Sequence, residues 1–254
     1  MEKFYLEVPT IDRKMKIIYL LSGPLKQEGL SNEIKESLKK DLNGKTTISF
    51  ISSSPDDSNK TKLYIYGDND EVVGLINHLK DIIDIKGISI IDNRIPKAEG
   101  IKTILNSDVI YLLGGDPIKQ LEFIKENEYD KAIKEYNGII LGTSAGAMNL
   151  GTISYYSKDE AYDKTFFYDG IGIVDVTVDP HFDITNEEQV EEAKKYSKEQ
   201  EIIGLPNSSA IRIEDKDIEY INKCYVFQDG ITYETQSNQD AHKKVITKRN
   251  KLRI

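Results

Sequence analysis

The sequence predicts an α/β fold in which a parallel sheet is covered by helices on both faces. Short apolar runs of strand character alternate, through the first half of the chain, with segments whose apolar residues recur at helical spacing. Two of the apolar runs end in glycine-rich turns, at residues 114–115 and 142–146. Because ligands bind at the carboxyl ends of parallel strands, both glycine turns are expected at the ligand-binding edge.

The elements are expected in the following order. Strands are predicted at 16–23, 46–51, 88–91, 108–113 and 138–143, and then at 170–179, 202–205, 210–213, 218–221 and 225–227. Helices are predicted at 31–42, 68–83 and 97–105, through 121–133, and at 185–198, where Thr185 and Glu188 have capping-box spacing. The last short strands, with the Asp229-Gly230 turn, predict C-terminal hairpins that close the far side of the sheet.

Composition restricts the class of protein. The chain has 254 residues, no linker and no repeat, so a single α/β domain spanning 1–254 is expected. A formal net charge of −9 repels a phosphate backbone and argues against nucleic acid as a partner. No apolar run approaches the ~20 residues of a membrane span, and residues 1–7 do not resemble a secretory signal. We therefore expect a cytoplasmic protein without a membrane partner.

Two other features receive no chemical role. Cys224 is the only cysteine; it excludes an internal disulfide and, within an apolar run, is expected to be a buried structural thiol. The basic stretch at 243–254 is expected to be a solvated tail, and an arm that contacts a partner is the alternative.

The turn around Ser144 has the pattern of a nucleophile elbow between a strand and a helix. Gly142 and Gly146 remove side chains that would collide at a sharp reversal, and Ser144 would be strained with its hydroxyl exposed. The amide of Ala145 would then face negative charge developing on a substrate carbonyl, which suits acyl transfer. The alternative is a small-residue turn that only packs a helix against the sheet.

A second anion-binding loop is expected after the strand at 108–113. Asp116 can cap a helix that begins at Pro117, and the preceding Gly114 and Gly115 allow the backbone to approach a ligand. The amide of Gly115 is thus a candidate second oxyanion donor. The alternative is that this segment is an ordinary strand-to-helix turn without a ligand.

A serine nucleophile needs an adjacent base, which is usually histidine. His78 falls within a predicted helix and His242 lies in the basic tail. His181 instead follows Asp179-Pro180 at the end of an apolar strand, on the edge of the sheet where Ser144 is expected. We therefore predict that Ser144 and His181 meet.

The motifs at 142–147, 113–116, 170–174 and 179–182 together resemble the peptidase E family of serine peptidases, which contains α-aspartyl dipeptidases and cyanophycinases. The resemblance extends from the first strand to Ile211. It implies a flavodoxin-like fold similar to class I glutamine amidotransferases, with Ser144 as nucleophile, His181 as general base, and Gly115 and Ala145 as oxyanion donors. No cofactor and no metal are implied.

Two residues are candidates for orienting His181, because members of the family use acids at two different positions. In dipeptidases of the family an acid follows the elbow, and Asp159 stands at that spacing. In cyanophycinases a glutamate serves, and Asn207 replaces it here. Asn207 could accept a hydrogen bond from imidazole but carries no charge, so Asp159 is preferred and Asn207 is second. Asp159 could also be a solvated loop acid.

The resemblance implies hydrolysis of short peptides, in particular dipeptides with an N-terminal aspartate. Lys158, Lys164 or Arg212 could bind the aspartate carboxylate, and the sequence does not choose among them. An esterase of the α/β-hydrolase type is one alternative, because Ser144, Asp159 and His181 also follow its chain order. A catalytically silent relative that binds a peptide or metabolite is another. Association as a homodimer is compatible with each reading.

Overall fold

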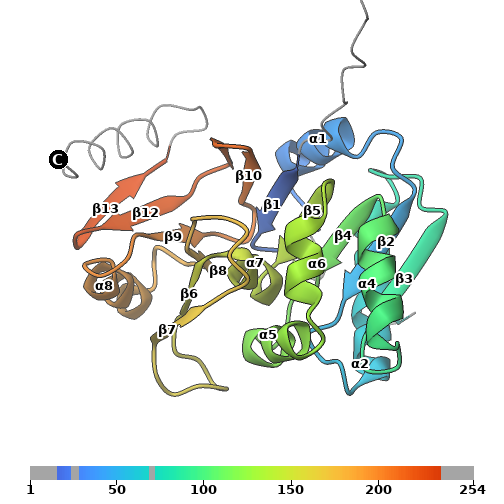
Figure 1. Ribbon diagram of the computed structural model, residues 1–254. Helices are drawn as coiled ribbons and strands as arrows, with labels where there is room; N and C mark the ends of the chain where they lie inside the picture. The colour runs from blue at the N-terminus through green and yellow to red at the C-terminus, as the bar shows by residue number, and fades with distance from the viewer. Residues whose placement is uncertain (1–15, 24–28, 69–71, 236–254) are drawn as a thin grey trace, which may run out of the picture.

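The central sheet has seven strands, in the order β11-β10-β1-β5-β4-β2-β3 (Figure 1). The computed structural model describes residues 16–23, 29–68 and 72–235. The strands are β1 (Ile17–Leu21), β2 (Thr47–Ile51), β3 (Gly87–Ile91), β4 (Val109–Leu112), β5 (Ile139–Thr143), β10 (Ala210–Glu214) and β11 (Asp217–Ile221). The first five pair in parallel, and β10 and β11 extend the sheet as an antiparallel hairpin beside β1. The predicted α/β fold with a mainly parallel sheet is confirmed.

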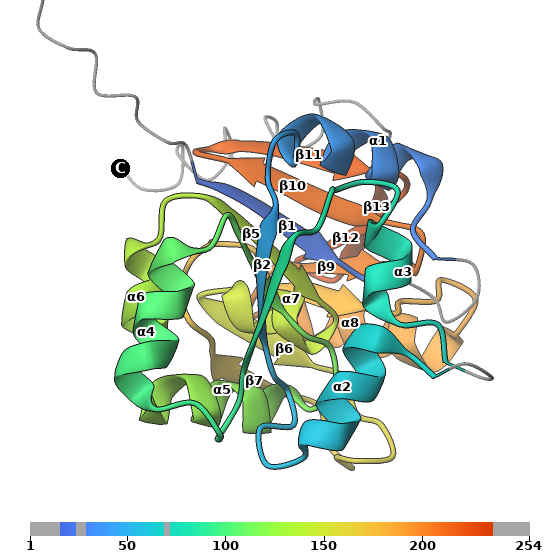
Figure 2. The same ribbon diagram turned by 90° about the vertical axis from the view of Figure 1, so that its right-hand side faces the viewer.

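Helices cover both faces of this sheet (Figure 2). One face is covered by α1 (Asn32–Asp41), α2 (Ser58–Tyr66) and α3 (Leu75–Leu79), and the other by α4 (Lys97–Asn106), α5 (Pro117–Glu126) and α6 (Tyr129–Glu135). Two separate apolar clusters fill the two interfaces, because alternate residues of each central strand point to opposite faces. Within the described ranges, no helix is long and apolar enough to cross a bilayer.

The helix expected at 68–83 is much shorter in the structure. Residues 69–71 lie outside the described part, Gly67 and Val73 form an antiparallel bridge, and helix α3 begins only at Leu75. The carboxylate of Asp68 accepts a hydrogen bond from the Val72 amide at 2.7 Å. This local turn satisfies backbone groups that a helix would otherwise use, which explains why helical spacing was misleading here.

The helix expected through 121–133 is divided in two. Helix α5 ends at Glu126, and Glu128 adopts the left-handed conformation with φ of 56° before α6 begins at Tyr129. The Glu128 carboxylate pairs with Lys97 and Lys131, which fixes the turn. The apolar residues of both helices continue on one face, so periodicity alone did not reveal the interruption.

The second half of the chain forms a smaller sheet of four strands and a hairpin beside the main sheet (Figure 1). Its elements are α7 (Ala145–Leu150), β6 (Ile153–Tyr156), β7 (Phe166–Asp169), β8 (Val178–Pro180), α8 (Glu187–Tyr196), β9 (Ile202–Leu205), β12 (Tyr225–Gln228) and β13 (Ile231–Glu234). The strand expected at 170–179 is thus only three residues long. Asn186, not Thr185, caps α8, with its side chain accepting from the Gln189 amide. The hairpin β6–β7 was not predicted.

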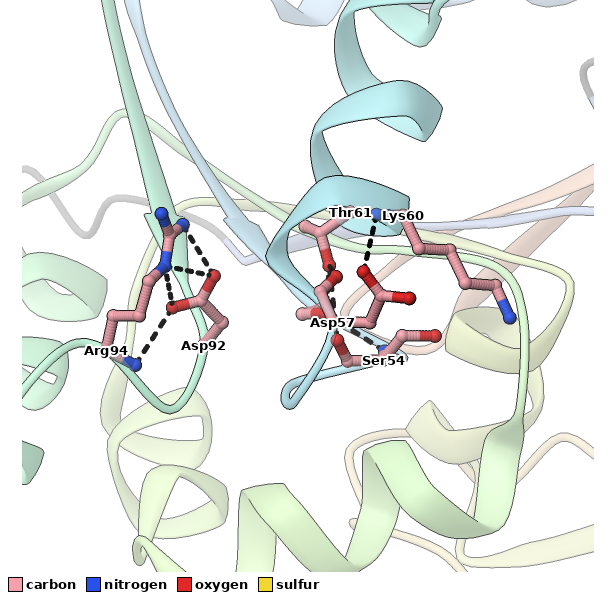
Figure 3. Close-up of polar contacts among 7 residues, drawn as sticks. Ser54, Asp57, Lys60, Thr61, Asp92 and Arg94 are labelled. Carbon is pink, nitrogen blue, oxygen red and sulfur yellow. Dashed lines mark hydrogen bonds and ion pairs between the residues drawn. The ribbon is translucent and has the colours of Figure 1, made fainter.

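Polar contacts hold the loops that follow β2 and β3 at the carboxyl edge of the sheet. Figure 3 shows Asp57 accepting from the Lys60 amide at 2.9 Å, which caps α2, and Arg94 paired with the buried Asp92 at 2.6 Å. The loop between β2 and α2 carries Ser53, whose hydroxyl donates to the Gly114 carbonyl. The cap therefore also fixes a loop that supports the glycine turn after β4.

The close packing of α7 against the sheet depends on Gly146. A Cβ at this position would collide with the backbone carbonyl of Leu112, which cannot move without disturbing β4. Gly146→Ala should lower the free energy of unfolding by about 3 kcal/mol, measured by chemical denaturation. Gly87→Ala is the control, because its Cβ would meet only the Thr47 methyl group at 3.1 Å, and a change within about 1 kcal/mol is expected. Equal effects of the two substitutions would contradict this account.

Candidate active site

Ser144 stands between the end of β5 and the start of α7, in a strained backbone conformation. Its φ and ψ are 51° and −113°, values that a residue with a side chain rarely adopts. The strain is maintained because β5 is central in the sheet and α7 is buried along its whole length. The hydroxyl of Ser144 is thereby directed beyond the edge of the sheet, where it can meet groups from other segments.

The structure places His181 beside Ser144, as predicted, but the expected common sheet edge is wrong: β8, which precedes His181, belongs to the four-stranded sheet, whereas β5 belongs to the central sheet. His181 Nε2 lies 2.9 Å from Ser144 Oγ. His181 follows the short strand β8 and also has a positive φ, 58°, so both members of the pair are in the left-handed half of backbone space. This distance is within hydrogen-bond reach, which is what proton transfer from a serine to an imidazole requires.

The other ring nitrogen of His181 contacts Asn207, in the turn that leaves β9. His181 Nδ1 and Asn207 Oδ1 are 2.6 Å apart. Because the amide oxygen can only accept, Nδ1 is the donor in this contact, and in this tautomer Nε2 can accept from Ser144. The contact with Asn207 thus favours the tautomer in which Nε2 faces Ser144 as an acceptor.

Asp159, the preferred partner at the sequence level, does not make this contact. Its carboxylate accepts from the Tyr156 hydroxyl at 2.7 Å and from the amides of Ala161 and Tyr162. The loop between β6 and β7 turns the acid toward its own backbone, a common use of aspartate in turns. The preference for Asp159 over Asn207 is therefore corrected, although Asp159 does line the same cavity.

The end of β1 holds the backbones of both Ser144 and His181. The Ser144 amide donates to the Leu21 carbonyl at 2.9 Å, and the His181 amide donates to Ser22 Oγ at 2.8 Å. Ser22 is fully buried, and its own hydroxyl donates to the Leu205 carbonyl at 2.8 Å. The last residue of β1 and the residue that follows it therefore set the positions of two side chains that are 37 residues apart in sequence.

The glycine turn after β4, at Gly114 and Gly115, also lies against Ser144. A Cβ built on Gly114 would lie 3.4 Å from Ser144 Cβ, so the two loops are in contact. Gly115 has a φ of 134°, which strongly favours glycine, and it lines the same cavity as Ser144 and Ala145. Ala145 is the first residue of α7, so its amide has no partner within the helix.

A cavity of about 400 Å³ opens beside Ser144 and His181. Its walls come from the glycine turn after β4, the elbow, the loop after β6, the end of β8 and one side of α8. This volume is suited to a ligand as small as a short peptide. Within the described ranges, no three His, Cys, Asp or Glu side chains converge closely enough to hold a metal ion.

Carboxyl groups dominate the charge of this cavity. Asp179 is the most buried of them, with 2% of the residue exposed, and its oxygens accept from Ser157 Oγ at 2.9 Å and Gln189 Nε2 at 3.2 Å. Burial raises the pKa of Asp179 to about 7, because these neutral donors only partly replace water around the charged form. Asp179 was noted in the sequence only as part of the motif around His181.

Several residues of the site were not predicted. Ser22, directly after β1, holds the His181 amide, and Gln189 and Glu192 line the cavity from α8. No local motif distinguishes these three from ordinary polar residues. Of the candidate cations, Lys158 lines the cavity, whereas Arg212 is held in ion pairs by Asp41 and Glu214. Cys224 is buried, as expected, and His242 lies outside the described residues.

The buried carboxyl of Asp179 predicts a specific pH dependence of stability. A raised folded pKa means that the folded protein binds more protons than the unfolded chain between about pH 4 and 7, so stability falls as pH rises through that range. Asp179→Asn should remove this loss and raise the melting temperature at pH 8 by about 3 °C or more, with a smaller gain at pH 4.

The control is Asp183→Asn, an exposed cavity acid whose pKa is lowered by hydrogen bonds from Thr185. This variant should not be stabilised at pH 8. Thermal melts of both variants across pH 4–8 make the comparison, and a gain for Asp179→Asn that is independent of pH would refute the assignment.

One family model and two solved structures are similar to this chain. Residues 18–221 match the model of Peptidase family S51. A crystal structure of a peptidase from an acI-B1 Actinobacterium superimposes with a TM-score of 0.58 at 16% identity, covering 89% of this chain and 96% of that one. A candidate peptidase E protein from Listeria monocytogenes EGD-e gives 0.57 at 20% identity, covering 87% of this chain and 100% of that one.

The two structural neighbours share the fold of this chain, and no curated protein matches its sequence. The family match is the stronger finding, because it spans the central sheet from β1 to β11 and includes Ser144, His181 and Asn207. The chain is a member of Peptidase family S51.

Proposed function

We propose that this protein is a serine peptidase that hydrolyses short peptides through an acyl-enzyme on Ser144. The observation that carries the proposal is the 2.9 Å contact between Ser144 Oγ and His181 Nε2 at the mouth of a cavity. Membership of Peptidase family S51 supports a peptidase rather than an esterase of the α/β-hydrolase type.

In the first step, Ser144 Oγ attacks the carbonyl carbon of the scissile bond while His181 Nε2 accepts the hydroxyl proton. The imidazolium then protonates the leaving amine, which departs and leaves an ester on Ser144. In the second step, His181 accepts a proton from water as the water attacks this ester. Return of that proton to Ser144 Oγ releases the carboxyl product and restores the starting state.

Negative charge develops on the substrate carbonyl oxygen in both steps. We assign its stabilisation to the amides of Ala145 and Gly115, which line the cavity on either side of Ser144. Gly114 serves this arrangement indirectly: its carbonyl accepts from Ser53, which holds the turn that carries Gly115. Asn207 orients His181 by accepting the Nδ1 proton.

The resemblance to α-aspartyl dipeptidases adds the proposal that an N-terminal aspartate is accepted. Lys158 is the candidate for its carboxylate, because it lines the cavity and its ion pair with Glu188 is exposed, so a substrate carboxylate can compete for the ammonium group. Arg212 is 12% exposed at its side chain and paired with two acids, which makes it unsuitable. Lys164 does not line the cavity.

Covalent labelling tests the nucleophile and the base. A fluorophosphonate should label Ser144 in the wild type, and Ser144→Ala should lose both the label and hydrolysis of Asp-Xaa dipeptides. His181→Ala should lower the labelling rate by about 100-fold or more, because the serine then has no base. Mass spectrometry of the labelled peptide gives the site.

Ser157→Ala is the matched control, because Ser157 lines the same cavity but contacts Asp179 instead of His181. It should keep the label on Ser144. Turnover that persists in folded Ser144→Ala protein would refute the proposed nucleophile.

The role of Asn207 predicts unequal effects of three substitutions. Asn207→Ala should lower kcat by about 100-fold, because His181 loses the group that selects its tautomer. Asn207→Asp should keep or raise kcat, since a carboxylate accepts the same proton and also stabilises the imidazolium. Asp159→Asn should change kcat less than about threefold, because Asp159 contacts Tyr156 instead of His181. Steady-state kinetics on one peptide check all three, and a larger loss for Asp159→Asn than for Asn207→Ala would reverse the assignment.

A further inference from the structure

Three different elements hold the backbone of the segment that contains His181. Each of three consecutive amides donates one hydrogen bond: His181 to Ser22 Oγ at 2.8 Å, Phe182 to the Leu205 carbonyl at 3.0 Å and Asp183 to Gln189 Oε1 at 2.9 Å. Ser22 directly follows β1, Leu205 ends β9, and both are fully buried. Gln189 belongs to helix α8 and is only partly buried. The last contact can therefore be changed without a substitution in the buried core.

The side chain of Gln189 joins the two ends of this segment. In addition to the bond from the Asp183 amide, Gln189 Nε2 donates to Asp179 Oδ2 at 3.2 Å. Asp179 lies before His181 in the sequence and Asp183 lies after it, so one side-chain amide holds the chain on both sides of the histidine. His181 itself has a φ of 58°. A strained residue persists only where the surrounding chain is fixed, and Gln189 fixes both sides.

The groups that Gln189 connects are themselves anchored. Asp179 is buried, and its other carboxylate oxygen accepts from Ser157 Oγ at 2.9 Å. At the start of α8, the Gln189 amide donates to Asn186 Oδ1 at 3.2 Å, which caps the helix. Because Asp179 and the first turn of α8 are held independently, the Gln189 side chain connects two fixed points. A connection of this kind restrains His181 instead of moving with it.

These contacts require the hydrogen-bonding groups of glutamine. The Asp179 carboxylate needs a donor, and the Asp183 amide needs an acceptor. A side-chain amide carries both at its end, whereas a charged carboxylate can only accept and an ammonium group can only donate. Burial raises the pKa of Asp179 to about 7, so its carboxyl group is mainly charged at pH 8. A glutamate at position 189 would then repel it.

We propose that Gln189 is a positioning residue that keeps the imidazole of His181 between Ser144 and Asn207. The inference rests on the proposed function, because His181 is the general base of that mechanism. The two ring nitrogens make contacts of 2.9 Å with Ser144 and 2.6 Å with Asn207, so a small rotation of the backbone at His181 weakens both. Gln189 acts through the backbone of residues 179–183 and takes no part in proton transfer.

Gln189→Glu tests this role at pH 8. A fluorophosphonate should label Ser144 about tenfold more slowly than in the wild type, because a displaced base transfers the proton less well. On peptides, kcat should fall by a similar factor while KM changes by less than about twofold. Gln200→Glu is the matched control, because Gln200 donates to Thr177 Oγ1 at 3.3 Å, before the start of β8. This variant should be labelled within about twofold of the wild-type rate.

A double variant distinguishes loss of the contact from general damage to the fold. With Asp179→Asn and Gln189→Glu together, an amide at position 179 donates to a carboxylate at position 189, and the Asp183 amide keeps its acceptor. Gln189→Glu should therefore slow labelling by less than about threefold when Asp179→Asn is already present. Asp179→Asn alone is the reference, because the introduced amide oxygen still accepts from Gln189. A loss of about tenfold in both backgrounds would contradict the proposed contact.

Nitrogen chemical shifts of the His181 ring separate this inference from the proposed function, because they report the tautomer without turnover. At pH 8 the wild type should carry the proton on Nδ1, and Gln189→Glu should show both tautomers. Comparison with His181→Ala identifies the signals. If the ring signals of Gln189→Glu differ in this way but the wild type neither reacts with a fluorophosphonate nor hydrolyses peptides, the proposed function fails and the inference stands. If the wild type reacts and Gln189→Glu leaves the ring signals and the labelling rate unchanged, the inference alone fails.

Discussion

The carboxyl end of β1 is the constraint on which the rest of the site depends. The Leu21 carbonyl holds the amide of Ser144, and the neighbouring Ser22 hydroxyl holds the amide of His181. Both held residues have positive φ, a conformation that costs of order 1–3 kcal/mol for a residue with a side chain. The strain persists because β1 pairs with β5 on one side and β10 on the other, so its end cannot shift without loss of sheet hydrogen bonds. The geometry of the pair is therefore a property of the sheet.

This dependence explains which parts of the site could be predicted from sequence. Parallel strands bring their carboxyl ends to one edge, and this led to the expectation that Ser144 and His181 meet. The two residues do meet, but β5 and β8 lie in different sheets, and contacts at the end of β1 bring them together. The partner of His181 did not follow from the order of the strands. Asn207 and Asp159 both stand in loops near this edge, and the choice between them depends on where β9 ends and how the β6–β7 loop turns. Those are details of side-chain direction that neither periodicity nor spacing contains.

The two helices whose bounds were predicted wrongly also differ because of polar side chains. The apolar residues near 68–83 have helical spacing, but Asp68 offers the Val72 amide a local partner and the chain turns before α3 begins. At Glu128, ion pairs with two lysines stabilise a left-handed residue that divides one expected helix into two. In both cases a polar side chain changes the backbone while the apolar face continues. Hydrophobic pattern predicts which side of an element is buried more reliably than where the element ends.

The charge of the cavity also bears on the chemistry at Ser144. Acid-rich walls attract a cation, but they oppose the negative charge that develops on the substrate carbonyl during acylation. In the proposed mechanism, the amides of Ala145 and Gly115 would stabilise that charge against the electrostatic repulsion from the cavity acids. Since Asn207 carries no charge, it orients His181 without stabilising an imidazolium, and the acids of the cavity wall are the groups that would stabilise that positive charge.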